Sequence, residues 1–101
     1  MAMSEDRGVT RLYDYCTGHD ACAPRQQETG SENVFINDRK CGRVTDIYNV
    51  HACDAHPPHN DVIVGGSSRV FVNDKPIARI TDPVSLGGNV MTCSVDVFAS
   101  D

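Results

Sequence analysis

The stretch GSENVFINDRKCGRVTD at residues 30–46 returns 36 positions later as GSSRVFVNDKPIARITD at residues 66–82. Nine of the seventeen positions are identical, which chance similarity between two short segments does not produce. Self-similarity of this kind identifies a repeat architecture, in which neighbouring units complete one another's core. These two segments therefore decide the fold.

A third copy is split between the two ends of the chain. The sequence RLYD at residues 11–14 aligns with RVTD and RITD, which end the two complete copies. The sequence SVDVF at residues 94–98 aligns with SSRVF at residues 67–71. The split unit thus combines residues 94–98 with residues 9–14, so the two ends of the chain must pair to complete it. The sequence predicts a closed ring of three similar units.

Each unit has the pattern of a β-hairpin. The runs VFI at residues 34–36 and VFV at residues 70–72 are β-branched and aromatic, and each is followed by an Asn-Asp pair suited to a turn. No segment has the apolar spacing of an amphipathic helix. The predicted class is all-β: a small cone of three β-hairpins with pseudo-three-fold symmetry, closed by pairing of the N- and C-terminal strands. Segments 15–30, 47–66 and 83–93 are predicted to be long loops that leave the ring opposite the Asn-Asp turns and converge at the tip.

The composition indicates one domain, residues 1–101, with a thin core. Only 40% of the residues are hydrophobic and there is no Trp. We therefore expect a disulfide, a metal or a partner chain to stabilise the domain. The net charge of −5 argues against nucleic acid and anionic membranes as partners. We also expect assembly in a reducing cytosol, because the N-terminus lacks the features of a signal peptide. There, cysteines are more often metal ligands or buried thiols than disulfides.

An Arg and an Asp recur three residues apart in every unit, at Arg11, Arg43 and Arg79 with Asp14, Asp46 and Asp82. A catalytic carboxylate triad would need groups in unlike environments, and these are equivalent by repeat. We therefore predict three structural contacts that fix the ends of the hairpins.

Histidines occupy equivalent positions in two of the loops. His19 and His51 each lie five residues after a repeat Asp, and the second loop adds His56 and His59. Loops that leave the same end of a small ring converge, so their imidazoles can reach one centre. A structural Zn²⁺ ion takes four nitrogen or sulfur ligands. The spacing predicts a zinc site of His19, His51, His59 and one thiolate, whereas His56, just before Pro57-Pro58, is expected to face solvent.

Three cysteines are candidates for the thiolate. Cys93 immediately precedes Ser94, where the third loop returns, and is the predicted ligand. Cys53 and Cys22 are the alternatives, because they lie closer in sequence to the histidines. A chain with four exposed loop histidines and no metal is the alternative to the site as a whole.

The run KPIAR at residues 75–79 resembles the Pro-Ala-Ala-Arg motif of PAAR-repeat proteins, with Pro76, Ile77, Ala78 and Arg79 as the motif residues. The loop starts at Gly18-His19 and at residues 51–53, and Gly66-Ser67-Ser68 before a strand, are also similar to that family. The resemblance covers residues 8 to 99 approximately. The short chain is most similar to the stand-alone tip proteins of contractile phage tails, and type VI secretion tips are close relatives.

The resemblance implies a metal-stabilised tip that caps and sharpens the trimeric β-helical spike of a contractile injection machine, one tip per trimer. Such a monomeric tip is not an enzyme and touches the target cell envelope transiently during puncture, without stable membrane insertion. Its place would be the tail baseplate of a virion assembled in the host cytoplasm, or alternatively a type VI secretion apparatus. The family's metal, zinc or iron, is held near the apex by histidines and a cysteine, which maps onto His19, His51 and His59.

The chain departs from the family at two places. Leu86-Gly87 stands where the family's third loop usually carries its thiol, and Ile77 replaces the central Ala of the motif.

Two other functions fit parts of the sequence. A zinc hydrolase needs an open metal position and a general base, for which Asp20, Asp54 or Asp61 would serve, but the chain has no HExxH motif. A free-standing metal-binding or adhesion module would instead be stable without a trimeric partner.

Overall fold

The computed structural model describes residues 6–19, 22–53 and 56–101, and for residues 51–53 and 56 the backbone alone. The regular structure in these ranges is almost entirely β, which confirms the predicted class. The strands are β1 (Arg7–Gly8), β2 (Phe35–Ile36), β3 (Arg39–Lys40), β4 (His51–Cys53), β5 (His56–His59), β6 (Phe71–Val72), β7 (Lys75–Pro76) and β8 (Phe98–Ala99), and a 3-10 turn, η1, spans Ser85–Gly87. Within the described ranges, no helix combines the length and the apolar character needed to cross a bilayer.

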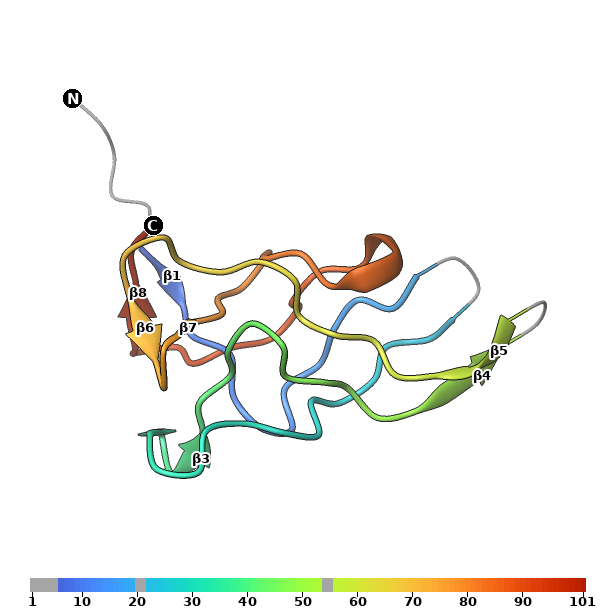
Figure 1. Cartoon of the computed structure of the whole chain (residues 1–101), viewed down its shortest axis with the longest axis horizontal. Helices are drawn as coiled ribbons and strands as arrows, with labels where there is room; N and C mark the ends of the chain where they lie inside the picture. Colours follow the sequence, from blue (N-terminus) through green and yellow to red (C-terminus); the bar gives the residue numbers. More distant parts are fainter. Residues whose placement is uncertain (1–5, 20–21, 54–55) are drawn as a thin grey trace.

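The strands form antiparallel pairs, β2 with β3, β6 with β7, β1 with β8 and β4 with β5. In the β1–β8 pair, Gly8 lies opposite Phe98, and the Val9 amide donates to the Val97 carbonyl at 3.0 Å. The chain ends therefore pair, as the split repeat predicts. Figure 1 shows β1 and β8 beside β6 and β7 at one end of the molecule, while β4 and β5 lie at the opposite end.

A closed triangle of backbone hydrogen bonds marks the pseudo-three-fold axis. Its corners, Thr10, Gly42 and Ala78, each immediately precede the Arg of a repeat unit. The Thr10 amide donates to the Ala78 carbonyl at 3.1 Å, the Gly42 amide to Thr10 at 2.9 Å, and the Ala78 amide to Gly42 at 3.0 Å. The three repeat units are thus joined directly to one another at equivalent residues.

The repeated Arg and Asp residues make the same contacts in all three units. Each Arg backbone amide donates to Oδ2 of its Asp at 2.8 or 2.9 Å, and each guanidinium Nε donates to the same oxygen at 2.8 to 3.0 Å. These bonds close a tight turn, in which the residue before the Asp has a positive φ: Tyr13 (75°), Thr45 (84°) and Thr81 (70°). The prediction of structural Arg–Asp contacts is confirmed.

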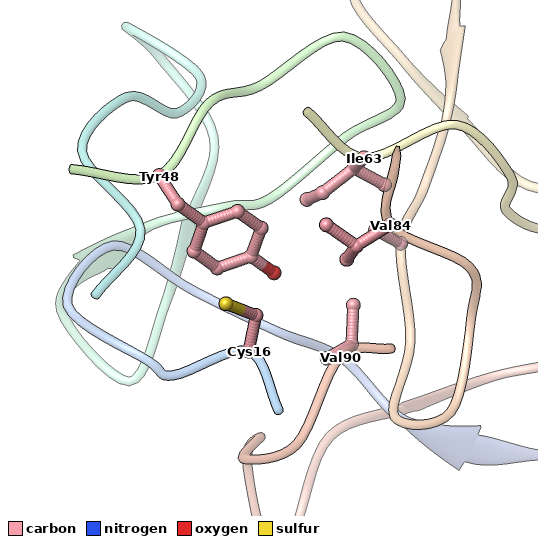
Figure 2. Close-up of a cluster of buried hydrophobic side chains, with 6 residues drawn as sticks. Cys16, Tyr48, Ile63, Val84 and Val90 are labelled. Atoms are coloured by element: carbon pink, nitrogen blue, oxygen red, sulfur yellow. The ribbon is translucent and has the colours of Figure 1, made fainter. Parts of the chain in front are cut away.

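The core has two parts, one on either side of this triangle. At the end with β1 and β8, one cluster consists of buried residues in the paired strands or directly after them: Val9, Cys41, Val72, Ile77 and Ala99, with Val34, Ile36, Val70 and Val97 packed against them. The second cluster leads toward the loops and contains Cys16, Tyr48, Ile63, Ala78, Val84 and Val90. Figure 2 shows Cys16, Tyr48 and Val84, each two residues after a repeat Asp, pointing toward one another. The three-fold arrangement therefore continues into the loops.

Residues 51–53 and 56–59 were predicted to belong to a loop, and here the prediction is wrong. They form the β4–β5 pair, in which His51 lies opposite His59 and Cys53 opposite His56, with an irregularity between His51 and Cys53. The sequence has no alternation of apolar and polar residues in this segment, and Pro57-Pro58 argue against a strand inside a sheet. A two-stranded pair tolerates both prolines, because an edge strand does not need every amide as a donor.

Candidate metal centre

The first loop holds His19 in a buried position. Cys16, three residues earlier, is fully buried in the loop-side core, which fixes the start of the loop. The amide of His19 donates to the Cys22 carbonyl at 3.1 Å, and the Cys22 amide donates back to His19 at 2.6 Å. Only 2% of the His19 side chain is exposed. Its imidazole is therefore fixed inside the tip and is not a solvated loop side chain.

The segment after β5 leads from the second loop back to the core and carries Asp61 and Ile63. Ile63 is fully buried, and residues two apart in an extended chain point to the same side. Asp61 therefore faces inward with Ile63, and only 2% of its side chain is exposed. The amide of Tyr48 donates to the Asp61 carbonyl at 2.9 Å, which ties the returning arm to the outgoing one.

These side chains meet in one group. Nδ1 of His19 lies 3.2 Å from Oδ2 of Asp61, and Nε2 of His59 lies 3.2 Å from Oδ1 of the same carboxylate. The two imidazole rings are 5.2 Å apart between centroids and tilted by 35°. One ligand atom from each of the three residues lies within 4.8 Å of the others. Two imidazoles and a carboxylate form a donor set that suits a borderline divalent cation such as Zn²⁺.

A hydrogen bond to the backbone orients the His59 ring. Nδ1 of His59 lies 2.9 Å from the carbonyl oxygen of Pro57. Because a carbonyl only accepts, Nδ1 carries the hydrogen and donates it. Nε2 is then the ring nitrogen that faces Asp61. Metal-bound histidines are held in the same way, with the second ring nitrogen donating to a carbonyl or a carboxylate.

The structure brings together two of the four predicted ligands, His19 and His59. His51 lies directly opposite His59 in the backbone register of β4 and β5, and its side chain lies outside the described residues, as do those of Cys53 and His56. Cys93 is not part of the group that the described side chains form. Its Sγ packs so closely on Gly8 that a Cβ added there would collide with it. Burial, and then the charge of Asp14, raise the pKa of the Cys93 thiol, which disfavours the thiolate.

Cys22 is disulfide-bonded, so its sulfur is not a free thiolate. The expectation of reduced cysteines is therefore wrong for Cys22. Cys16 and Cys41 are free and buried, and burial raises the pKa of Cys41 to about 12. Both behave as small hydrophobic core residues.

Sequence reasoning considered Asp61 only as a hydrolase base and missed it as a partner of the histidines. The signal was present in the two-residue spacing of His59, Asp61 and Ile63, which places all three on one face of an extended arm. The predicted motif residues belong to the framework, since Ile77, Ala78 and Arg79 are at most 5% exposed. Nη1 of Arg79 donates to Oδ1 of Asp101 at 2.8 Å and so fastens the C-terminal end.

Comparison with protein families gives an assignment independent of this geometry. The family model of the PAAR motif matches residues 17–92, which is well over half of the chain. The matched segment contains His19, His59, Asp61 and the run of residues 76–79. No match was found among curated proteins.

Proposed function

Because the chain belongs to the PAAR motif family, whose members are spike tips of contractile injection systems, we propose that it caps a trimeric β-helical spike with one copy per trimer. The proposed place is the tail baseplate of a phage, and a type VI secretion spike is the alternative within the same family. The tip would sharpen the spike for puncture of the target envelope and would carry out no chemical reaction.

The closed triangle of Thr10, Gly42 and Ala78 is the observation that carries this proposal. It gives a single chain an approximate three-fold axis. A trimer with three-fold symmetry offers three equivalent surfaces around its own axis. A partner with the same symmetry can contact all three at once, so one chain is enough to close the end of a trimer.

Three exposed aromatic rings repeat around this axis. Phe35, Phe71 and Phe98 begin β2, β6 and β8, and they are 53%, 55% and 57% exposed. The strand residues that flank each Phe belong to or pack against the buried cluster at the end with β1 and β8, so the Phe side chains lie on the opposite faces of their strands. Buried aromatic anchors dominate the energy of many interfaces. We propose that these three rings contribute equivalent contacts to the spike.

Binding to the cognate spike tests this role. The Phe71→Ser variant is expected to weaken the complex, and Phe35→Ser should weaken it by a similar factor because the two positions are equivalent. Leu86, also exposed at 63%, lies on η1 outside the paired strands, so Leu86→Ser serves as the matched control. Failure of the wild-type chain to bind any trimeric spike would contradict the proposal.

We further propose that a metal ion, Zn²⁺ or iron, binds to His19, His59 and His51 and so links the loops of the tip. His51 is included because its backbone pairs with His59 and its repeat position equals that of His19. A bound ion links loops that otherwise share a small apolar core, and its binding energy adds to the folding energy. The His19→Ala variant should lose the metal and melt at a lower temperature, whereas His56→Ala should keep both. Unchanged metal content in His19→Ala would refute the site.

A further inference from the structure

We infer that the partner binds this chain by main-chain pairing, in which three extended strands, one from each chain of a trimer, are added to open strand edges at Phe35, Phe71 and Phe98. This inference rests on the proposed function in one respect, namely that a trimeric spike is the partner. It goes further, because it names the structural element of the spike that binds and the main-chain atoms of the tip that receive it. Contacts between aromatic rings alone do not require it.

The register of the strand pairs leaves the main chain of each Phe facing away from its partner strand. In an antiparallel pair, residues that exchange main-chain hydrogen bonds alternate with residues that do not. The residue before each Phe is of the first kind, because its carbonyl accepts from the opposite strand. The Cys41 amide donates to Val34 at 2.9 Å, Ile77 to Val70 at 2.9 Å and Val9 to Val97 at 3.0 Å. Each Phe is therefore of the second kind, and its N–H and C=O point outward.

The residues opposite the three Phe agree with this geometry. Phe35, Phe71 and Phe98 lie opposite Lys40, Pro76 and Gly8 respectively. The carbonyls of these opposite residues turn to the next segment of the ring, where they accept from Leu12 at 2.8 Å, Val44 at 2.9 Å and Ile80 at 2.8 Å. Pro76 has no N–H, so it fits a position that donates nothing to the ladder. The strands β3, β7 and β1 are thus bonded along both edges.

The strands β2, β6 and β8 are bonded along one edge. Among the described residues, no other segment donates a backbone hydrogen bond to these three Phe residues or accepts one from them. Figure 1 shows β6 and β8 at the outer limit of their end of the molecule, with β7 and β1 on the side of the loops. The open edges therefore lie at the end opposite the tip.

An open edge of this kind is a template for another strand. Proteins usually protect exposed edges with Lys, Pro or a bulge, yet the open position here is a Phe in all three units. Each edge offers one main-chain donor and one main-chain acceptor, which select an extended segment as the occupant. Because the edges repeat around one axis, they select three equivalent segments, and a trimer supplies them.

The exposed rings and the open edges belong to the same three strands, and an added strand can use both. Side chains stand roughly perpendicular to a sheet, whereas the main-chain hydrogen bonds lie within it. A strand that pairs with the edge at Phe71 therefore places its own side chains beside the ring, as cross-strand neighbours. The hydrogen bonds fix the position of the strand, and the ring adds apolar contact.

Amide hydrogen exchange of the ¹⁵N-labelled full chain tests the inference, with and without the trimeric spike of the same injection machine. The amides of Phe35, Phe71 and Phe98 should exchange rapidly in the free chain and about 100-fold more slowly in the complex, because each becomes a hydrogen-bond donor. The rate at Leu86, which lies on η1 outside the paired strands, should not change. Unprotected Phe amides in the complex would overturn the inference.

A pair of variants separates main-chain pairing from simple burial of the Phe. Phe71→Pro and Phe71→Ala both remove the ring, and only Phe71→Pro also removes the N–H, at an edge position where proline is tolerated. The dissociation constant for the spike should be about 10-fold higher for Phe71→Pro than for Phe71→Ala, because an acceptor of the spike loses its donor. Thermal unfolding shows whether both variants are folded. Equal affinities of the two folded variants would contradict main-chain pairing.

These outcomes are distinct from failure of the proposed function. A spike that binds the wild-type chain and leaves the Phe amides unprotected would overturn main-chain pairing and leave the capping role intact. If Phe71→Pro does not fold, the exchange rates of the wild-type chain still decide between the two. A wild-type chain that binds no trimeric spike would overturn the capping role and this inference with it.

Discussion

Arg39 reaches from one repeat unit to Asp14 in the next, with 3.0 Å between its Nη2 and Oδ1 of the carboxylate. The same carboxylate also accepts from Arg11 of its own unit and from the hydroxyl of Thr92 at 2.9 Å. Arg7, at the position equivalent to Arg39, approaches Asp82 in the same way, at 3.1 Å. A repeat Asp therefore closes its own turn and also joins neighbouring units.

Asp14→Ala is expected to destabilise the fold strongly. The substitution leaves Arg11 and Arg39 without their shared partner, and breaking a buried ion pair by removing one member costs about 3–5 kcal/mol. Denaturant unfolding measures the change. Asp38→Asn is the control, because Asp38 is exposed in the turn after β2 and Asn also accepts its positive φ of 67°. Equal stabilities of the two variants would contradict this account of the Arg–Asp contacts.

Gly42→Ala tests the packing at the three-fold axis. A Cβ on Gly42 would lie 2.6 Å from Cγ2 of Thr10 and 2.8 Å from Oε1 of Gln27, both in the buried interior. Overpacking of this kind costs about 1–3 kcal/mol. Adding Thr10→Ser removes the nearer methyl group, so the double variant should recover part of the loss in a thermal melt. Full wild-type stability of Gly42→Ala would show that the triangle is not closely packed.

Removal of residues 94–101 should abolish cooperative folding. The deletion removes β8, the Ser94 amide that donates to Val9 at 2.8 Å, and Ala99 from the core at that end. It also leaves an open strand edge at β1, where the ring was closed. Circular dichroism and thermal unfolding would detect the loss. Val95→Ser in the full chain is the control, because Val95 is 89% exposed, and a shortened chain that melts like this control would refute the closed ring.

Acid should loosen the same closure. The hydrogen bond from Arg79 lowers the pKa of Asp101, and Arg7 acts in the same direction. The resulting stabilisation is present above the ordinary pKa of an Asp and is lost as the pH falls through the lowered value. The melting temperature of the wild-type chain should therefore decrease as the pH is lowered from about 5 to about 2. The decrease should be smaller in the Asp101→Asn variant. An identical pH dependence of the two proteins would exclude a contribution from Asp101.

The ring could be predicted from the sequence because its determinants are local and repeated. The Arg–Asp spacing, the Val-Phe runs and the split third unit can all be recognised in the sequence. The hydrogen bonds that join the units at Thr10, Gly42 and Ala78 became visible only in the structure. The tip was harder to predict, because its loops have unequal lengths. Beyond His19 and His51, the repeat no longer shows which residues of one loop are equivalent to which residues of another. The β4–β5 pair lacks an apolar alternation, and the partnership of Asp61 with two histidines depends on how far each loop extends. Cys93 was selected by symmetry, yet its position next to Gly8 is fixed by the packing of the end that carries β1.

Native mass spectrometry of the chain mixed with its cognate trimeric spike tests the central claim most directly. The approximate three-fold axis predicts one copy of this chain bound to each trimer, with no higher occupancy when the chain is in excess. Three copies per trimer would mean that each spike chain binds its own tip, and would contradict the proposal that one chain caps all three.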